Sequence, residues 1–294
     1  MPSYRAAPRR RIFALLACLF LGPQLVFAVV EPTGELPVSP REKALYELGI
    51  FGGMAYLPDY PASNQSRPKW LAAPYFIFRG HVVRADREGA RARLARNRLF
   101  DVEMSFSGSF ATNSSGNEAR RGMPDLDYLA EIGPRLSFPL SDLGGFGKLN
   151  LFLPLRAVFS TNFSRFNHRG FTVTPALYAR LWDFLRPGWF GIAQLTANFS
   201  DRQNSAYFYD VAPEFARPDR PFYDARAGYM GSDFLAGLLI PIGARVRLFT
   251  GAQFLDHDGS ANTASPLFKQ RTNVTAIVGL SYMFFQSKKS ALPL

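Results

Sequence analysis

Hydrophobic and polar residues alternate along this chain with a period of two. From Phe100 to Phe110, apolar or small residues occupy the even positions, and Asp101, Glu103 and three serines occupy the odd positions. Successive side chains of a β-strand point to opposite faces, so this segment predicts a strand with one apolar and one polar face. The pattern returns in four further segments between residues 128 and 200. Most of the chain is therefore expected to form β-strands.

These strands have the length and polarity of membrane-spanning strands. A strand that crosses the hydrocarbon layer obliquely needs about 9 to 11 residues, and the alternating segments are that long or slightly longer. Lipid offers no hydrogen-bond partner to a bare backbone amide, so such strands must close into a ring. The sequence therefore predicts an all-β fold, an antiparallel transmembrane β-barrel of the outer-membrane type.

The number of strands depends on one segment. The candidate strands are 45–56, 70–79, 81–93, 98–110, 128–140, 148–161, 171–183, 189–200, 233–242, 245–255 and 273–285. This odd number conflicts with the even number that bacterial single-chain barrels contain. Either Val82 to Ala95 is a hairpin of two short strands broken near Glu88 and Gly89, which gives about 12 strands, or one candidate is not a full strand, which gives about 10. We favour the larger number.

The connections between strands differ in length in a regular way. The short ones are 141–147, 185–188 and 243–244, and the long ones are 111–127, 201–232 and 257–272. Short periplasmic turns and longer outer loops are typical of outer-membrane barrels. The longest loop, 201–232, is predicted either to bind a partner or to be a lid packed by its own side chains, over the mouth or inside the bore. Its candidate residues are Tyr207, Tyr209, Asp210, Glu214, Arg217, Arg220 and Tyr223.

Charged residues also fall on the predicted inner face of the barrel. They are Glu103, Glu131, Arg135, Arg156 and Arg180. Two interpretations remain open. These side chains either line a water-filled path for small solutes, or pair across a closed bore and serve stability. A barrel of about 12 strands lies between the small barrels filled by side chains and the large open porins.

The first residues predict export and divide the chain into segments. Residues 1–28 combine a basic start, an apolar core and a small-residue end, Val26-Phe27-Ala28, as in a cleaved secretory signal. A lipoprotein site at Cys18 is the less favoured alternative. Residues 29–44 are then a periplasmic N-terminal segment, 45–285 the barrel and 286–294 a C-terminal tail. The predicted location is the outer membrane of a Gram-negative cell.

Composition narrows the range of partners. Four of the 34 basic residues and none of the 23 acidic residues lie in the predicted signal, so 30 basic residues face 23 acidic ones in the mature chain. The arginines lack the aromatic spacing of a nucleic-acid module, so no nucleic-acid partner is expected and contact with anionic lipopolysaccharide is favoured. Aromatic residues at strand ends, including Trp70, Phe110 and Trp182, predict girdles at the membrane interfaces.

No constellation for catalysis or metal binding is visible. The only cysteine, Cys18, lies in the predicted signal, which excludes thiol chemistry in the mature chain. His81, His168 and His257 are interpreted as solvated loop residues, because a zinc site needs three or four converging ligands. Asp256-His257-Asp258-Gly259-Ser260 carries groups used by hydrolases, but adjacent residues of an extended chain point apart. We therefore predict no enzyme activity, cofactor or metal.

Several short motifs, weak singly and specific in their order, carry a family resemblance. They include Tyr56-Leu57-Pro58-Asp59-Tyr60-Pro61, Gly122-Met123-Pro124-Asp125-Leu126-Asp127, Tyr209-Asp210-Val211-Ala212-Pro213-Glu214-Phe215-Ala216 and Ser265-Pro266-Leu267. From Leu45 to Phe285 the chain resembles the outer-membrane family named for the MltA-interacting protein MipA and for OmpV. The resemblance implies a non-enzymatic barrel that joins a murein lytic transglycosylase to a bifunctional penicillin-binding protein.

The predicted function is accordingly a scaffold in the outer membrane for the synthesis and hydrolysis of peptidoglycan. The alternatives are a narrow porin-like channel or a surface adhesin, which other members of the resembled family exemplify. A surface hydrolase that uses His257 is the least favoured alternative.

Overall fold

The computed structural model describes residues 46–79, 83–86, 89–96 and 100–287. The predicted signal, the N-terminal segment 29–44, nearly all of the predicted tail 286–294 and the predicted loop residue His81 lie outside these residues. Side chains are described for the same ranges except 76–79, 83–86 and 89–96.

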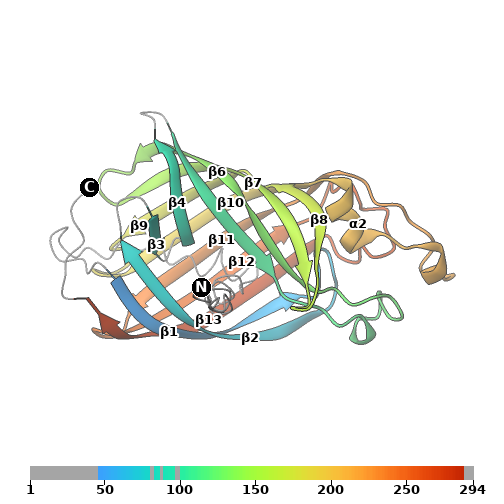
Figure 1. Ribbon diagram of the computed structural model, residues 1–294, viewed down its shortest axis with the longest axis horizontal. Helices are drawn as coiled ribbons and strands as arrows, with labels where there is room; N and C mark the ends of the chain where they lie inside the picture. The colour runs from blue at the N-terminus through green and yellow to red at the C-terminus, as the bar shows by residue number, and fades with distance from the viewer. Residues whose placement is uncertain (1–45, 80–82, 87–88, 97–99, 288–294) are drawn as a thin grey trace, which may run out of the picture.

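The described chain is built from antiparallel strands with little helix (Figure 1). The strands are β1 (Tyr46–Pro58), β2 (Ser66–Arg79), β3 (Val83–Asp86), β4 (Gly89–Arg96), β5 (Asp101–Ser109), β6 (Tyr128–Asp142), β7 (Gly147–Thr161), β8 (Phe166–Val173), β9 (Ala176–Trp182), β10 (Phe190–Ser200), β11 (Gly228–Pro241), β12 (Val246–Asp256) and β13 (Thr272–Gln286). Helical segments occur only in loops: η2 (Ser114–Gly116), α2 (Arg202–Tyr209) and η3 (Pro213–Phe215).

The strands form a closed ring. Strands that are neighbours in sequence pair with each other, except for β8 and β9, and β13 pairs with β1, so the hydrogen-bonded sheet returns to its start. β8 and β9 both pair with β7 and with β10. These two strands therefore share one position, and the 13 described strands occupy twelve positions around the barrel. The all-β barrel predicted from the alternation is confirmed.

Two strand positions differ from a simple reading of the periodicity. The segment 83–96 is a hairpin, β3 and β4, as favoured above. The predicted strand 171–183 begins earlier, at Phe166, and breaks between β8 and β9 at Pro175. Proline has no backbone N–H to give to the ladder, which explains the interruption.

The two ends of the barrel have different connections. At one end, which we call the short-turn end, residues 143–146, 183–189 and 242–245 join neighbouring strands, and β1 begins beside the last residue of β13. At the other end, which we call the long-loop end, residues 59–65, 110–127, 201–227 and 257–271 extend beyond the strands. Figure 1 shows α2 and the long loops together at one side of the barrel.

Outward side chains are apolar and exposed, and inward side chains are buried. On β1, for example, outward Ile50 is 51% exposed and inward Phe51 is 8% exposed. Exposed apolar residues on other strands include Leu155, Leu195, Phe234 and Val278. Such an outer surface suits lipid rather than water. No helix among the described residues has the length and apolar character to cross a membrane.

Apolar side chains form a cluster inside the bore. This inner cluster consists of Phe51, Ala55, Leu57, Tyr178, Phe190, Ile192, Leu235, Leu239, Phe249 and Ile277. Its members come from β1, β9, β10, β11, β12 and β13, so the cluster crosses the interior. Phe110 and Trp182 pack against it. The prediction that these two aromatics belong to an interfacial girdle is therefore wrong, because both side chains contact the interior.

Candidate functional site: the lumen and its cap

The long loops pack together into a cap over the long-loop end. We use the name cap for residues 59–65, 110–127, 201–227 and 257–271. Their shared apolar core, the cap cluster, contains Tyr60, Leu126, Tyr209, Val211, Ala225, Met230 and Leu267. Loop 201–227 is thus a lid across the mouth, packed against the other loops as well as by its own side chains.

Tyrosines hold the cap loops to one another. The Tyr60 hydroxyl donates to the backbone oxygen of Leu267 over 2.8 Å, and the Tyr209 hydroxyl donates to that of Pro61 over 3.0 Å. Burial raises the pKa of Tyr60 to about 12, although Arg120 partly opposes this shift. Burial likewise raises the pKa of Tyr209. Both hydroxyls therefore remain protonated donors at neutral pH.

Buried arginines bind loop carbonyls. Arg120 is 3% exposed and donates to the backbone oxygens of Phe208 and Pro124 over 3.1 and 3.2 Å. Arg220 is equally buried and donates to the backbone oxygen of Ala119 over 2.9 Å. Each guanidinium spans two loops, because its rigid fork of donors reaches several carbonyls at once.

The structure places most predicted lid residues inside the cap. Tyr207 accepts the backbone N–H of Asp127 over 2.6 Å, and Asp210 accepts that of Ala225 over 2.6 Å. The Tyr223 hydroxyl donates to the side-chain oxygen of Asn262 over 3.3 Å. These residues, with Tyr209 and Arg220, are engaged in holding the loops. Glu214 is exposed on η3, and Arg217 pairs with Asp219 at the surface.

His257 is buried, so its interpretation as a solvated loop residue is wrong. Its Nε2 accepts the backbone N–H of Ala62 over 3.2 Å, and its Nδ1 lies 3.3 Å from the Met230 oxygen. Asn273, 3.2 Å from Nε2, donates to the Ser63 oxygen over 2.9 Å. Burial lowers the pKa of His257. His168 lies on β8, where its ring meets those of Phe159 and Phe171 edge-on.

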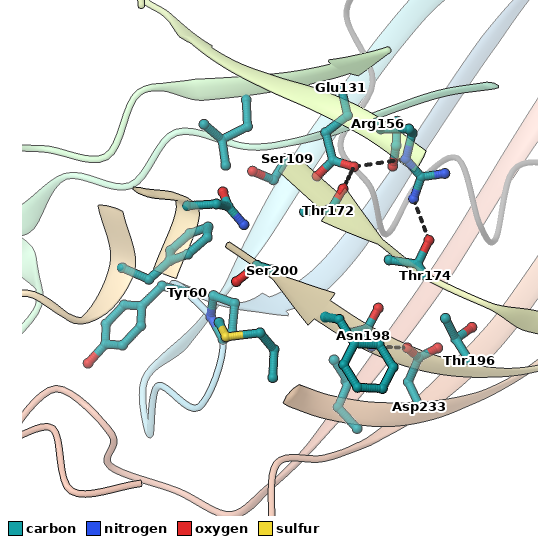
Figure 2. Close-up of a pocket in the computed structure, with 18 of the residues that line it drawn as sticks. Tyr60, Ser109, Glu131, Arg156, Thr172, Thr174, Thr196, Asn198, Ser200 and Asp233 are labelled. Atoms are coloured by element: carbon teal, nitrogen blue, oxygen red, sulfur yellow. Dashed lines mark hydrogen bonds and ion pairs between the residues drawn. The ribbon is translucent and has the colours of Figure 1, made fainter. Parts of the chain in front are cut away.

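A cavity of about 250 Å³, lined by both apolar and polar residues, lies between members of the inner cluster and of the cap. Its lining includes Leu57 and Phe152 from the inner cluster side, and Tyr60 and Met230 from the cap cluster. Between them the walls carry hydroxyl and amide groups together with charged side chains such as Lys69, Glu131 and Asp233, and Figure 2 shows several of the polar groups facing one space. We call this space the lumen cavity.

An ion pair with three neutral partners forms one wall of the lumen cavity. Arg156 donates from Nε to Glu131 over 2.9 Å, and its other nitrogens donate to Ser105 and Thr174 over 3.0 and 2.7 Å. The Thr172 hydroxyl donates to the same Glu131 oxygen over 3.1 Å. Figure 2 shows this network on neighbouring strands. The charges are thus satisfied by one another.

The other predicted lumen charges are also on the inner face. Arg135 pairs with Glu103 across β5 and β6 at 2.7 Å, and its guanidinium lies 4.1 Å from the ring centre of Phe152. Arg180 lies on β9, opposite inward Ile192 of β10. On the far wall, the Asp233 carboxylate accepts from Asn198 and Gln253 over 2.9 and 2.7 Å.

The groups that face this interior define which chemistry its described residues could carry out. No group of three His, Cys, Asp or Glu residues that could hold a metal ion occurs in the described part of the chain. The partners of the His257 ring nitrogens are two backbone groups and an amide, so this ring is not paired with a nucleophile there. Hydroxyl, amide and charged groups beside aromatic rings are the types of side chain that line ligand pockets in proteins.

Sequence reasoning missed several residues that build this site. Tyr60, Arg120 and Asn273 bind across loops that are far apart in the chain. In the sequence they stood out only because they lie in or near the short motifs of the family resemblance. Those motifs mark loops rather than strands.

Comparison with known proteins identifies a family. A family model described as MltA-interacting protein MipA matches residues 50–284. None of the curated proteins matches the chain. Among solved structures, a bacterial polysaccharide outer membrane secretin is 9% identical, with 83% of this chain and 100% of that chain covered and a TM-score of 0.40. Outer membrane phospholipase A from Escherichia coli is 12% identical, with coverages of 87% and 96% and a TM-score of 0.33. Likenesses this low do not identify a shared function.

Proposed function

The chain belongs to the family of the MltA-interacting protein MipA, and on that basis we propose that it is a non-enzymatic outer-membrane scaffold that docks enzymes of peptidoglycan turnover. The family match over residues 50–284 carries the proposal. The name of the family, MltA-interacting protein, points to a murein lytic transglycosylase as the partner. The resemblance of the sequence motifs adds a bifunctional penicillin-binding protein.

The location follows from the surface of the barrel. A closed ring leaves no bare sheet edge except where β3 and β4 are short, and the outward residues are apolar. These features and the family membership support a place in the outer membrane. We infer that the short-turn end faces the periplasm, because the first residues of β1 and the last residues of β13 lie there.

The short-turn end offers a surface for a periplasmic partner. Phe146, Leu185 and Ile242 lie in three successive turns of the ring and are 74%, 70% and 61% exposed. Exposed apolar residues gathered at one end often mark a protein interface. A peptidoglycan enzyme in the periplasm can reach this end, whereas the cap lies on the other side of the membrane.

A narrow channel is less well supported than a scaffold. Inside the barrel, the inner cluster brings apolar side chains of six strands together, and the cap packs over the long-loop end. A solute would have to displace both. An adhesive role for the cap remains compatible with its exposed residues, such as Phe222.

A capture experiment tests the scaffold. The purified protein should retain a murein lytic transglycosylase from envelope extracts. A variant with Phe146→Ser, Leu185→Asn and Ile242→Ser should lose at least about 10-fold of this capture, since about 1.4 kcal/mol of lost binding is already tenfold. Asparagine is chosen at 185 because Leu185 has a φ of 67°, which asparagine tolerates.

The matched control is Phe222→Ser, which removes an equally exposed aromatic side chain from the cap. It should bind like the parent protein. Failure of the parent to retain any murein hydrolase or synthase, where known complexes are recovered, would contradict the scaffold. If the triple variant captures as much transglycosylase as the parent, the docking surface lies elsewhere on the protein.

A further inference from the structure

Asp233 of β11 is a buried carboxylate in the wall of the lumen cavity, and no cation balances its charge. This residue is 7% exposed. Its oxygens accept hydrogen bonds from the side-chain amides of Asn198 and Gln253 over 2.9 and 2.7 Å. Within the described part of the chain, no lysine or arginine forms an ion pair with it. Its titratable neighbour is His257, which is uncharged at neutral pH because burial lowers its pKa.

The opposite wall of the lumen cavity is balanced. Glu131 pairs with Arg156 over 2.9 Å, and Glu103 pairs with Arg135 over 2.7 Å. Figure 2 shows the pair of Glu131 and Arg156 on one side of the space and Asp233 on another. A buried carboxylate without a counter-charge is costly, even where neutral groups donate hydrogen bonds to it. The wall that contains Asp233 therefore favours a bound cation.

Two further charged residues line the cavity beside the cap. The Lys69 ammonium donates to the backbone oxygen of Ala111 over 2.9 Å. The antiparallel bridge between Thr112 and Leu126 places Asp127 opposite Ala111 on the neighbouring segment. Lys69 and Asp127 thus bring opposite charges to the same part of the lining, where each offsets the other. The net charge of the lining is then that of the unpaired carboxylate on β11.

Three buried hydrogen-bonding atoms of cavity-lining residues also lack a partner among the described residues. Gln253 Oε1 and Asn204 Oδ1 are acceptors without a donor, and both residues are 5% exposed. Arg135 Nε, on the balanced wall, is a donor without an acceptor. Buried polar groups of proteins are nearly always hydrogen-bonded. These atoms therefore indicate a bound molecule that carries both hydrogen-bond donors and hydrogen-bond acceptors.

We propose that the lumen cavity binds a small hydroxylated amine, whose ammonium group pairs with Asp233. An ammonium supplies three N–H donors and the positive charge that this wall lacks. The hydroxyl groups of Thr172, Thr196 and Ser200, which Figure 2 shows around the same space, suit the hydroxyl groups of such a ligand. One water molecule needs roughly 10–15 Å³ of a cavity. A volume of about 250 Å³ therefore has room for a molecule of the size of an amino sugar.

Equilibrium dialysis against radiolabelled glucosamine tests this assignment. The full-length protein is refolded into detergent micelles with glucosamine present, so that the ligand does not have to pass the folded cap. At pH 7, one molecule should bind per chain, with a Kd below about 1 mM. Glucose, which has a hydroxyl in place of the ammonium, should bind at least about tenfold more weakly, because it brings no charge to Asp233.

Three results would overturn the proposal. The first is that glucosamine does not bind, which leaves water as the occupant of the cavity. The second is that both sugars bind equally, which removes the role of the ammonium. The third is that potassium chloride displaces glucosamine at equal concentration, which makes this a site for inorganic cations only.

Two variants of the cavity wall locate the ammonium. Asp233→Asn keeps the size of the side chain and should weaken glucosamine binding at least about tenfold, to the level of glucose. Asn198→Lys places a tethered ammonium next to Asp233 and should likewise abolish the binding of glucosamine, so the site can still be tested if Asp233→Asn fails to fold. Asp219→Asn, at the exposed surface of the cap, is the control and should bind like the parent protein.

Undiminished glucosamine binding by a folded variant of either cavity position would refute the site at Asp233. Transglycosylase capture depends on the turns at the short-turn end and is measured separately. Failure of the scaffold and failure of the amine site are therefore distinguishable.

Discussion

At the residue scale, the ion pair of Glu131 and Arg156 should be the most sensitive polar contact of the lumen. Glu131→Gln keeps the shape of the side chain but leaves the Arg156 charge without compensation among buried partners. Removing one member of a buried pair costs about 3 kcal/mol or more. We expect a loss of about 3 kcal/mol in the free energy of unfolding, measured by urea titration of the protein in vesicles.

The surface pair of Arg202 and Asp224 provides the control. Both side chains are more than half exposed, at 57% and 60%. Asp224→Asn should cost less than about 1 kcal/mol, because exposed pairs are solvated and screened. Equal effects of the two substitutions would show that the lumen pair is also hydrated, and would contradict its structural role.

Protonation of His257 should loosen the cap in acid. Burial lowers the pKa of this histidine in the folded protein, although Asp256 and Asp233 oppose the shift. The unfolded chain therefore binds a proton more readily, and stability falls as pH drops through about 6.5, the ordinary value. Above that pH the stability that depends on neutral His257 is fully present. Once it is protonated, Nε2 can no longer accept the hydrogen bond from the backbone N–H of Ala62.

Hydrogen exchange of residues 59–65 measures this effect. After correction for the intrinsic rate, exchange should be faster at pH 5.5 than at pH 7.5, and His257→Gln should remove most of the pH dependence. His168→Gln, on an outer strand face, should not. A parent protein with the same corrected protection at both pH values would rule out the predicted coupling.

Residue alternation predicted the lumen charges but not their partners. Glu103 and Arg135 are cross-strand neighbours, so their pairing follows once the register is known. Glu131 and Arg156 meet diagonally, since the residue opposite Glu131 is Val158. The burial of His257 was missed because it depends on loop 59–65. The contact residue in that loop, Ala62, is 195 positions away from His257 in the chain. Periodicity carries no information on such contacts.

At the scale of elements, Gly133 controls the approach of β6 to β7. A Cβ at this position would overlap the backbone oxygen of Leu155, which cannot move without breaking the ladder. Gly133→Ala should therefore destabilise the barrel by roughly 1–3 kcal/mol, the usual cost of overpacking. The temperature at which the folded form disappears on semi-native gels should fall accordingly.

Gly52→Ala is the matched control for this substitution. It lies on β1, and the nearest atom to its added Cβ is the Leu71 oxygen at 4.0 Å. Its folded form should persist to nearly the parent's temperature. If both alanine variants unfold at the same temperature, the close approach of β6 and β7 is not what requires glycine at position 133.

The strand pattern was largely predictable, and its exceptions have local causes. The parity of the barrel left a choice between a hairpin at residues 82–95 and one strand fewer; the hairpin was favoured, and the structure contains β3 and β4 there. Pro175 was visible in the sequence, but the alternation continued across it and hid the break.

At the scale of the whole molecule, the closed bore predicts electrical silence. The protein in planar bilayers should show no discrete conductance steps, because the inner cluster and the cap act in series. Deletion of residues 203–226 should not create steps by itself. Adding Phe51→Ser and Phe249→Ser, whose rings lie 4.6 Å apart in the inner cluster, should open a path. Steps from the parent protein would instead favour the channel.

The cap was the least predictable part of the molecule. Its contacts join residues as far apart as Tyr60 and Leu267, or Pro61 and Tyr209. For loop 201–232 the sequence predicted either a binding loop or a lid packed by its own side chains. It did not predict that four loops share one core, because no local pattern encodes the pairing of loops.

Assembly of the cap from four separate loops determines how an immune system would perceive this protein. Neighbouring surface points on it, such as those of residues 59–65 and 257–271, come from distant parts of the chain. Protective antibodies should thus recognise a discontinuous epitope. An antiserum raised against a synthetic peptide of one loop should stain denatured protein on blots yet ignore intact cells, and only refolded barrel should serve as an effective immunogen.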